Sequence, residues 1–80
     1  MINLKDIRLE NDTIFAKVIP ASKEDKPFDL VINAKKREIV KNTHGKMDAY
    51  VFFAMNSLLR SYDNTQRGKS MPKEDVVAWY

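Results

Sequence analysis

The motif with the most familiar chemistry is Gly68-Lys69-Ser70, the residue order that ends a phosphate-binding P-loop. A P-loop also needs a glycine five positions earlier, so that backbone amides surround the phosphate, and this position is Asp63. A carboxylate there would repel the phosphate. The motif should also connect a strand to a long helix, whereas here it follows an expected helix and precedes Met71-Pro72. We therefore expect a plain interhelical loop and no nucleotide site.

The same stretch partly matches a calcium-binding loop, because Asp63, Gly68 and Glu74 stand at its first, sixth and twelfth positions. Its fifth position is Arg67, a cation where the pattern needs an oxygen donor, and Pro72 stiffens the turn. Calcium binding depends on the full ligand set. The sequence therefore favours a polar loop that ends in a helix cap over a metal site, and we predict neither a metal nor a cofactor.

Catalytic side chains are scarce. The chain has one histidine, His44, and no cysteine, which excludes thiolate chemistry and sulfur-ligated metal sites. His44 has no neighbouring nucleophile and orienting group, so we expect a solvated loop residue that helps the following helix to start. The acid pairs Glu24-Asp25 and Glu74-Asp75 are adjacent rather than spaced along one helical face. We predict no catalytic residues; an active site shared across an oligomer interface is the remaining enzymatic alternative.

Basic residues at an expected hairpin tip offer a surface for nucleic acid. Lys35, Lys36 and Arg37 form the tip, and Lys41 and Lys46 lie near it in sequence. Such a tip can follow phosphates. Exposed tips are often charged, however, and no aromatic residue interleaves this run as a base-stacking platform would require. A nucleic-acid-binding accessory protein is therefore the alternative hypothesis.

Aromatic residues point instead to a protein interface. Helical spacing places Phe53 opposite the main apolar stripe, beside Arg60 and with Tyr50 at the edge. Aromatic residues and arginine are enriched at binding hot spots. The leading hypothesis is a non-enzymatic protein-interaction module that self-associates, as a homodimer or small oligomer, or docks on another protein. The candidate interface residues are Tyr50, Phe53, Arg60, Trp79 and Tyr80.

The elements that position these residues follow from apolar periodicity. Strands are predicted within residues 2–9, 13–19, 28–34 and 39–40, and helices over residues 46–62 and 70–80. The first strand should bulge at Lys5-Asp6, and the last hairpin should be capped by Asn33 with Lys36 or Arg37 in the left-handed position. The predicted fold is α+β: a small antiparallel β-meander of three to four strands, then one long amphipathic helix and a short C-terminal helix, in a single domain of residues 1–80.

The predicted sheet is apolar on both faces, and one long helix covers only one of them. Ile14, Ala16 and Val18 belong to one face, while Phe15 and Ile19 belong to the other. The second face should meet the short helix or a partner chain, or else stay exposed at a cost in solubility. The residues expected to cover it are Val76, Val77, Trp79 and Tyr80.

Composition limits the class of protein. The 80 residues are 44% hydrophobic, enough for one compact core, and carry a net charge of +3 with a pI near 9.3, which permits nucleic-acid contact without requiring it. No stretch approaches the roughly 20 apolar residues of a membrane span, and no basic head precedes an apolar run at the N-terminus. We expect a cytoplasmic protein without membrane contact.

Overall fold

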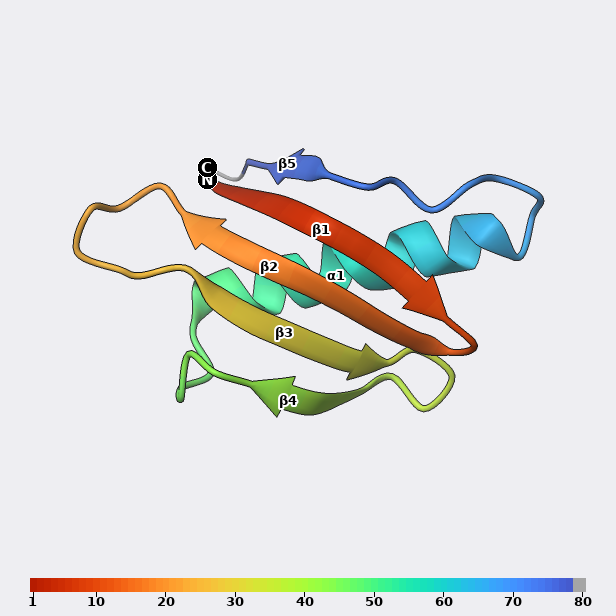
Figure 1. Cartoon of the computed structure of the whole chain (residues 1–80), viewed down its shortest axis with the longest axis horizontal. Coiled ribbons are helices and arrows are strands. Elements are labelled where there is room, and N and C mark those ends of the chain that lie inside the picture. Colours follow the sequence, from red (N-terminus) through yellow and green to blue (C-terminus); the bar gives the residue numbers. More distant parts are fainter. Residues whose placement is uncertain (79–80) are drawn as a thin grey trace.

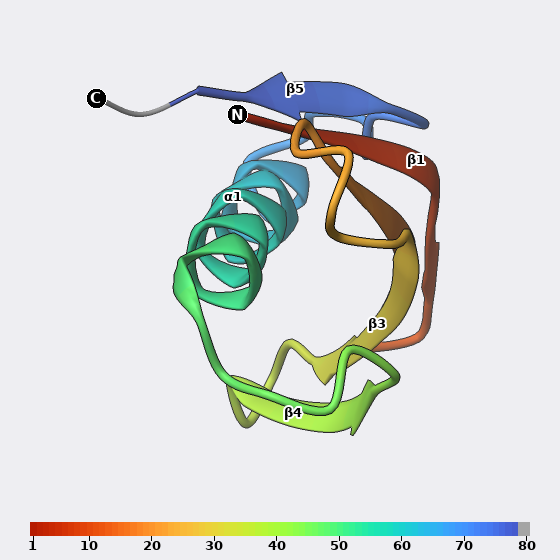
Figure 2. The same ribbon diagram turned by 90° about the vertical axis from the view of Figure 1, so that its left-hand side faces the viewer.

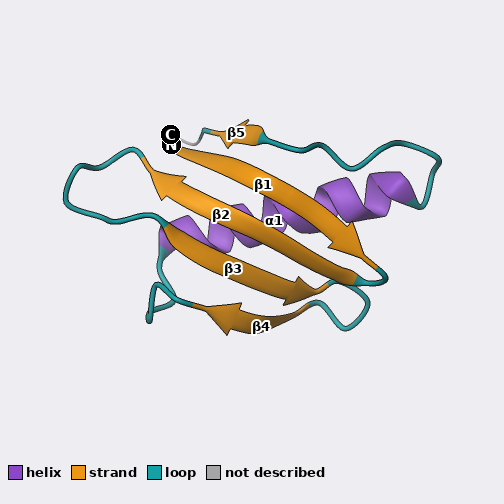
Figure 3. Ribbon diagram, viewed as in Figure 1, coloured by secondary structure: helices purple, strands orange, loops and turns teal. Residues whose placement is uncertain are grey.

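Over residues 1–78, which the computed structural model describes, the chain forms a five-stranded antiparallel sheet with one helix across one face (Figure 1). The elements are β1 (Ile2–Glu10), β2 (Thr13–Pro20), β3 (Phe28–Asn33), β4 (Glu38–Asn42), α1 (Ala49–Thr65) and β5 (Asp75–Val77). The strand order is β4-β3-β2-β1-β5. The predicted α+β class and the meander of the first four strands are confirmed (Figure 3).

The predicted bulge in β1 is present and decides which side chains share a face. The register against β2 shifts between Lys5 and Arg8, and Asp6 has a φ of 52°. Aspartate is among the few residues other than glycine that adopt this left-handed conformation readily. Without the bulge, a separation of three residues would place Lys5 and Arg8 on opposite faces. With it, they pair with Lys17 and Phe15, which share a face.

The turn between β3 and β4 also follows the sequence. Asn33 Oδ1 accepts a hydrogen bond from the Lys36 N–H at 3.0 Å. Arg37 has a φ of 57°, so it takes the left-handed position of the turn. Its guanidinium lies 3.2 Å from the Asp63 carboxylate near the end of α1, which helps to hold this strained turn against the helix.

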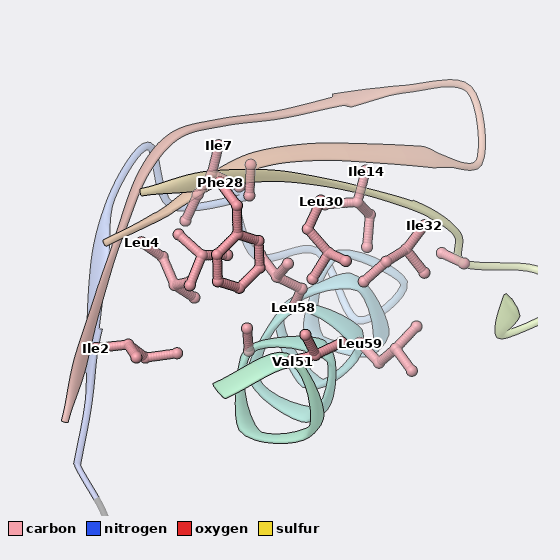
Figure 4. Close-up of a cluster of buried hydrophobic side chains, with 14 residues drawn as sticks. Ile2, Leu4, Ile7, Ile14, Phe28, Leu30, Ile32, Val51, Leu58 and Leu59 are labelled. Atoms are coloured by element: carbon pink, nitrogen blue, oxygen red, sulfur yellow. The ribbon is translucent and has the colours of Figure 1, made fainter. Parts of the chain in front are cut away.

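α1 begins at Ala49 rather than at residue 46 because Asp48 caps it. The Asp48 Oδ1 accepts a hydrogen bond from the Val51 N–H at 3.3 Å, which satisfies one of the free amides at the helix start. Figure 2 shows α1 on one side of the sheet only. The core lies between them, and its larger side chains point toward each other from the strands and the helix (Figure 4). The buried helix residues are Val51, Ala54, Leu58 and Leu59.

The predicted C-terminal helix is wrong over the described residues, because this segment forms β5. Val77 pairs with Ile2, and Val76 pairs with Asn3, in an antiparallel ladder along the outer edge of β1. The Ile7 N–H extends this edge by donating to the Lys73 carbonyl at 2.9 Å. Adjacent β-branched residues suit a strand, and a short isolated helix is costly to start. Trp79 and Tyr80 lie outside the described residues.

In the described part of the chain, the second face of the sheet is not covered by a short helix, which was the first of the predicted alternatives. Within residues 1–78 no helix lies across it, and β5 extends the sheet edge instead of covering the face (Figure 2). Its apolar residues Phe15, Ile19 and Val31 are half-buried and alternate with charged residues. An antiparallel sheet can be solvated on one side in this way. No helix of the described chain is long and apolar enough to cross a membrane.

Candidate binding site on the open face of the sheet

Charged and apolar side chains share the face of the sheet that points away from α1, called the open face below. Strand residues alternate between faces, and the buried residues Leu4, Ala16 and Leu30 mark the face that packs on the helix. The centre of the open face comprises Lys5 and Arg8 of β1, Phe15, Lys17 and Ile19 of β2, Asp29 and Val31 of β3, and Lys41 of β4.

One row of open-face residues runs across four strands. Arg8 pairs with Phe15, Phe15 with Val31, and Val31 with Lys41. The guanidinium carbon of Arg8 lies 4.3 Å from the centroid of the Phe15 ring, which is a cation–π contact. With a strand spacing of roughly 5 Å, Lys41 lies about 10 Å from Phe15 along the row. The row therefore combines an aromatic–arginine pair with a lysine at its far end.

A second, neighbouring row brings like charges together. Lys5 pairs with Lys17, and Lys17 pairs with Asp29. Lysines directly opposite each other on adjacent strands repel. Lys5 has an ion pair on its outer side, with Glu74 at 3.9 Å, but Lys17 has no ion pair within residues 1–78. An anion bound above this row would reduce the repulsion between the two lysines.

A shallow hollow of about 440 Å³ lies over these rows. Apolar Phe15 and Val31 contribute to its lining, and its charged residues are Asp6, Arg8, Lys17, Asp29 and Lys41. Within residues 1–78, none of these five side chains forms an ion pair with another. The hollow thus presents three cations and two carboxylates around an aromatic ring, with their charges available to a ligand.

The five lysine and arginine residues predicted to bind nucleic acid do not form one surface. Lys35, Lys36 and Arg37 lie in the β3–β4 turn, and Arg37 is paired with Asp63. Lys46 follows the other end of β4 and is 3.9 Å from the carboxylates of both Asp25 and Asp48. Lys41 belongs to the open face. The structure therefore groups Lys41 with Arg8 and Lys17, which the sequence did not indicate.

The aromatic residue that projects from α1 is Phe52, not Phe53 as predicted. Phe53 is half-buried, whereas its neighbour Phe52 is 59% exposed. The two rings meet edge to face, with centroids 5.7 Å apart. The reason is that α1 also packs along β5, where the Ser57 hydroxyl donates to Asp75 at 3.3 Å, so the covered arc extends to the side that carries Phe53.

The other predicted interface residues differ in exposure. Arg60 is exposed on α1. Tyr50 is half-buried beside His44, with ring centroids 6.4 Å apart. Burial and the nearby Asp25 carboxylate raise the pKa of the Tyr50 hydroxyl. The structure therefore places Tyr50 in the packed junction at the start of α1 rather than on a free surface with Arg60.

His44 is part of that junction and is not solvated as predicted. Its side chain is 8% exposed, stacks on Phe28 with centroids 4.3 Å apart, and its Nε2 lies 2.8 Å from Asp48 Oδ2. Burial opposes ionisation of Asp48, but hydrogen bonds from His44 and the Val51 N–H, with the charges of His44 and Lys46, hold its pKa below the ordinary value. The arrangement fixes the start of α1, which the sequence did indicate.

The segment that matches parts of a P-loop and of a calcium-binding loop makes structural contacts instead. Asp63, the first residue of the calcium-like pattern, pairs with Arg37, and Glu74, the twelfth, pairs with Lys5. In the part of the chain that the structure describes, no three His, Cys, Asp or Glu side chains are placed to hold a metal ion. Gly68 ends a turn after α1, and its N–H donates to the Thr65 carbonyl at 3.1 Å. The segment therefore serves as a connection from α1 to β5.

No protein-family model, curated protein or solved structure gives a significant match to this chain. The functional argument therefore depends on the geometry and charge of the open face.

Proposed function

We propose that this chain is a non-enzymatic binding protein that holds a single-stranded nucleic acid on the open face of its sheet. The observation that supports this most directly is the Arg8–Phe15 pair at the centre of the face, with the guanidinium 4.3 Å from the ring centroid. Exposed aromatic rings and arginine planes are the surfaces on which unpaired bases stack. The predicted nucleic-acid function is kept, but it moves from the hairpin tip to the open face.

The charges around this pair suit a sugar–phosphate backbone. Arg8, Lys17 and Lys41 line the hollow, and the adjacent Lys5 faces Lys17 directly. Phosphates bound there would neutralise the lysines that repel each other and release counter-ions. A positively charged groove that carries an aromatic platform is the usual combination for single strands, because their base faces are free to stack.

A duplex fits this surface less well. The bases of a duplex are already stacked and paired, so the Phe15 ring would have no free base to contact. The hairpin tip, which could follow duplex phosphates, has no aromatic residue and has one of its three cations paired with Asp63. We therefore expect a single strand to bind more tightly than a duplex of the same sequence.

The test is fluorescence anisotropy with a labelled oligouridylate of twelve nucleotides and a matched duplex, titrated at low and physiological salt. The single strand should bind, and because each neutralised phosphate contributes about −0.7 to the slope of log K against log salt, three cations predict a slope of about −2. Changing Lys17 and Lys41 together to glutamine should weaken binding by about tenfold or more. Phe15→Leu should weaken it as well, since it removes the ring but keeps an apolar side chain.

The matched control is the double change of Lys35 and Lys36 to glutamine, which removes the same charge from the hairpin tip. It should leave the affinity at physiological salt within about threefold of the wild type, because neither lysine lines the hollow and only screened attraction is lost. If the tip variant loses as much affinity as the open-face variant, the open-face site is wrong and the interface is the tip.

A protein interface on the outer side of α1 is a second candidate function. The observation that favours it is the exposure of Phe52, which is 59% accessible, together with Asn56 and Arg60 at successive spacings of four residues on the same side of the helix. Aromatic residues and arginine are enriched in binding hot spots. This side of α1 replaces the Phe53-centred surface that the sequence predicted.

A further inference from the structure

Phosphate binding does not explain the two carboxylates of the hollow, Asp6 and Asp29. Asp6 takes the left-handed position of the bulge in β1, which leaves Asp29 without an explanation. Its carboxylate lies among the cations of the open face and repels phosphate, yet within residues 1–78 it has neither an ion pair nor a side-chain hydrogen bond, although its cross-strand neighbour is Lys17. A charged acceptor in the middle of such a surface suits a ligand that presents hydrogen-bond donors there.

The backbone that carries Asp29 is held at a fixed distance from the aromatic ring. Asp29 is two residues from Val31, which pairs with Phe15, so Asp29 and Phe15 are diagonal neighbours about 7–8 Å apart. The Asp29 N–H donates to Thr43 Oγ1 at 2.8 Å, and its carbonyl accepts from the Thr43 N–H at 3.1 Å. The Asp29 carboxylate is therefore within reach of the edge of a base that stacks on the Arg8–Phe15 pair.

We infer that Asp29 is a specificity-determining residue that makes the open face prefer guanine among the bases of a bound single strand, an inference that rests on the proposed function. Guanine presents two adjacent donors, N1–H and the N2 amino group, which match the two oxygens of a carboxylate. Adenine and cytosine present one amino donor beside an acceptor nitrogen. Uracil presents one N–H between two carbonyl oxygens, which the carboxylate repels.

The experiment compares four labelled twelve-nucleotide RNAs that are identical except for the sixth and seventh positions, which are both guanine, adenine, cytosine or uracil. The guanine oligonucleotide should bind on the order of tenfold more tightly than the uracil oligonucleotide, as one well-placed bidentate contact allows. Asp29→Asn should abolish this preference while binding the uracil oligonucleotide at least as well as the wild type, because a phosphate-repelling charge is removed.

Asp6→Asn is the matched control, because it removes one carboxylate from the same hollow. It should keep the guanine preference and raise the affinity for all four oligonucleotides. Asp29→Ser, which also removes the carboxylate, should behave as Asp29→Asn does, and circular dichroism melts verify that each variant is folded.

The possible outcomes distinguish the role of Asp29 from the nucleic-acid function itself. The role of Asp29 is overturned if all four oligonucleotides bind with equal affinity. It is also overturned if the guanine preference survives Asp29→Asn or is lost equally in Asp6→Asn. In each of these cases the nucleic-acid function still stands. Binding of none of the four overturns both.

Discussion

Asp48 joins the loop between β4 and α1 to the start of α1 through two different contacts. One carboxylate oxygen accepts from the Val51 N–H at 3.3 Å, and the other lies 2.8 Å from His44 Nε2. His44 in turn stacks on Phe28 at the edge of the core. At the residue scale, this single side chain therefore couples helix initiation to the packing of the loop, whereas Lys17, Asp29 and Lys41 of the open face have no ion pair within residues 1–78.

The pH dependence of stability should report the contribution of Asp48. Because its pKa in the folded protein lies below the ordinary value of 3.8, the stabilisation is complete above that value and is lost as the pH falls through the lowered pKa. Asp48→Ala should lower the free energy of unfolding by about 1 kcal/mol at pH 7 and by less at pH 2.5, measured by urea denaturation. Asp29→Ala is the control and should cost under about 0.5 kcal/mol at both pH values. An Asp48→Ala cost that is the same at both pH values would contradict the assignment.

At the scale of elements, β5 shows why the last segment could not be read from the sequence. Ser70, Pro72 and the acids that follow form a helix-start pattern, but the unpaired outer edge of β1 offers backbone hydrogen bonds that no local pattern reveals. The long apolar stripe of α1 and the alternation in β1–β4 were strong enough to predict those elements. The cross-strand register could not be predicted from these patterns, so the Arg8–Phe15 pair and its link to Lys41 were not predicted.

The assignment of β5 can be checked with two adjacent substitutions. Val77 packs against the core, whereas Val76 is 59% exposed. In a strand, Val77→Ala should lower the free energy of unfolding by about 1 kcal/mol through lost burial, while Val76→Ala should cost under about 0.5 kcal/mol. In a helix, alanine would instead favour the segment by roughly 0.5 kcal/mol at the exposed position. Urea denaturation distinguishes them, and stabilisation by Val76→Ala would argue against the strand.

At the scale of the whole molecule, the described residues form two layers, the sheet and α1, and each layer has one side that no other element packs against. The sheet has one helix, so its open face meets solvent, and α1 has one sheet, so its outer side does too (Figure 2). The open face is mixed in charge and hollowed, whereas the outer side of α1 carries an exposed aromatic ring at Phe52. Their different chemistry predicts different occupants, so the two candidate functions can be tested separately.

Self-association tests the outer side of α1. One helix face offers less area than the roughly 800 Å² that each partner contributes to a stable complex, so we expect weak dimers that form only at high protein concentration. Phe52→Ser should keep the chain monomeric across that range in analytical ultracentrifugation, because it removes the aromatic contact. Val76→Ser is the matched control, since both side chains are 59% exposed and Val76 lies on another element. If the wild type stays monomeric at every concentration, or if Val76→Ser abolishes the dimers equally, α1 is not the self-association surface.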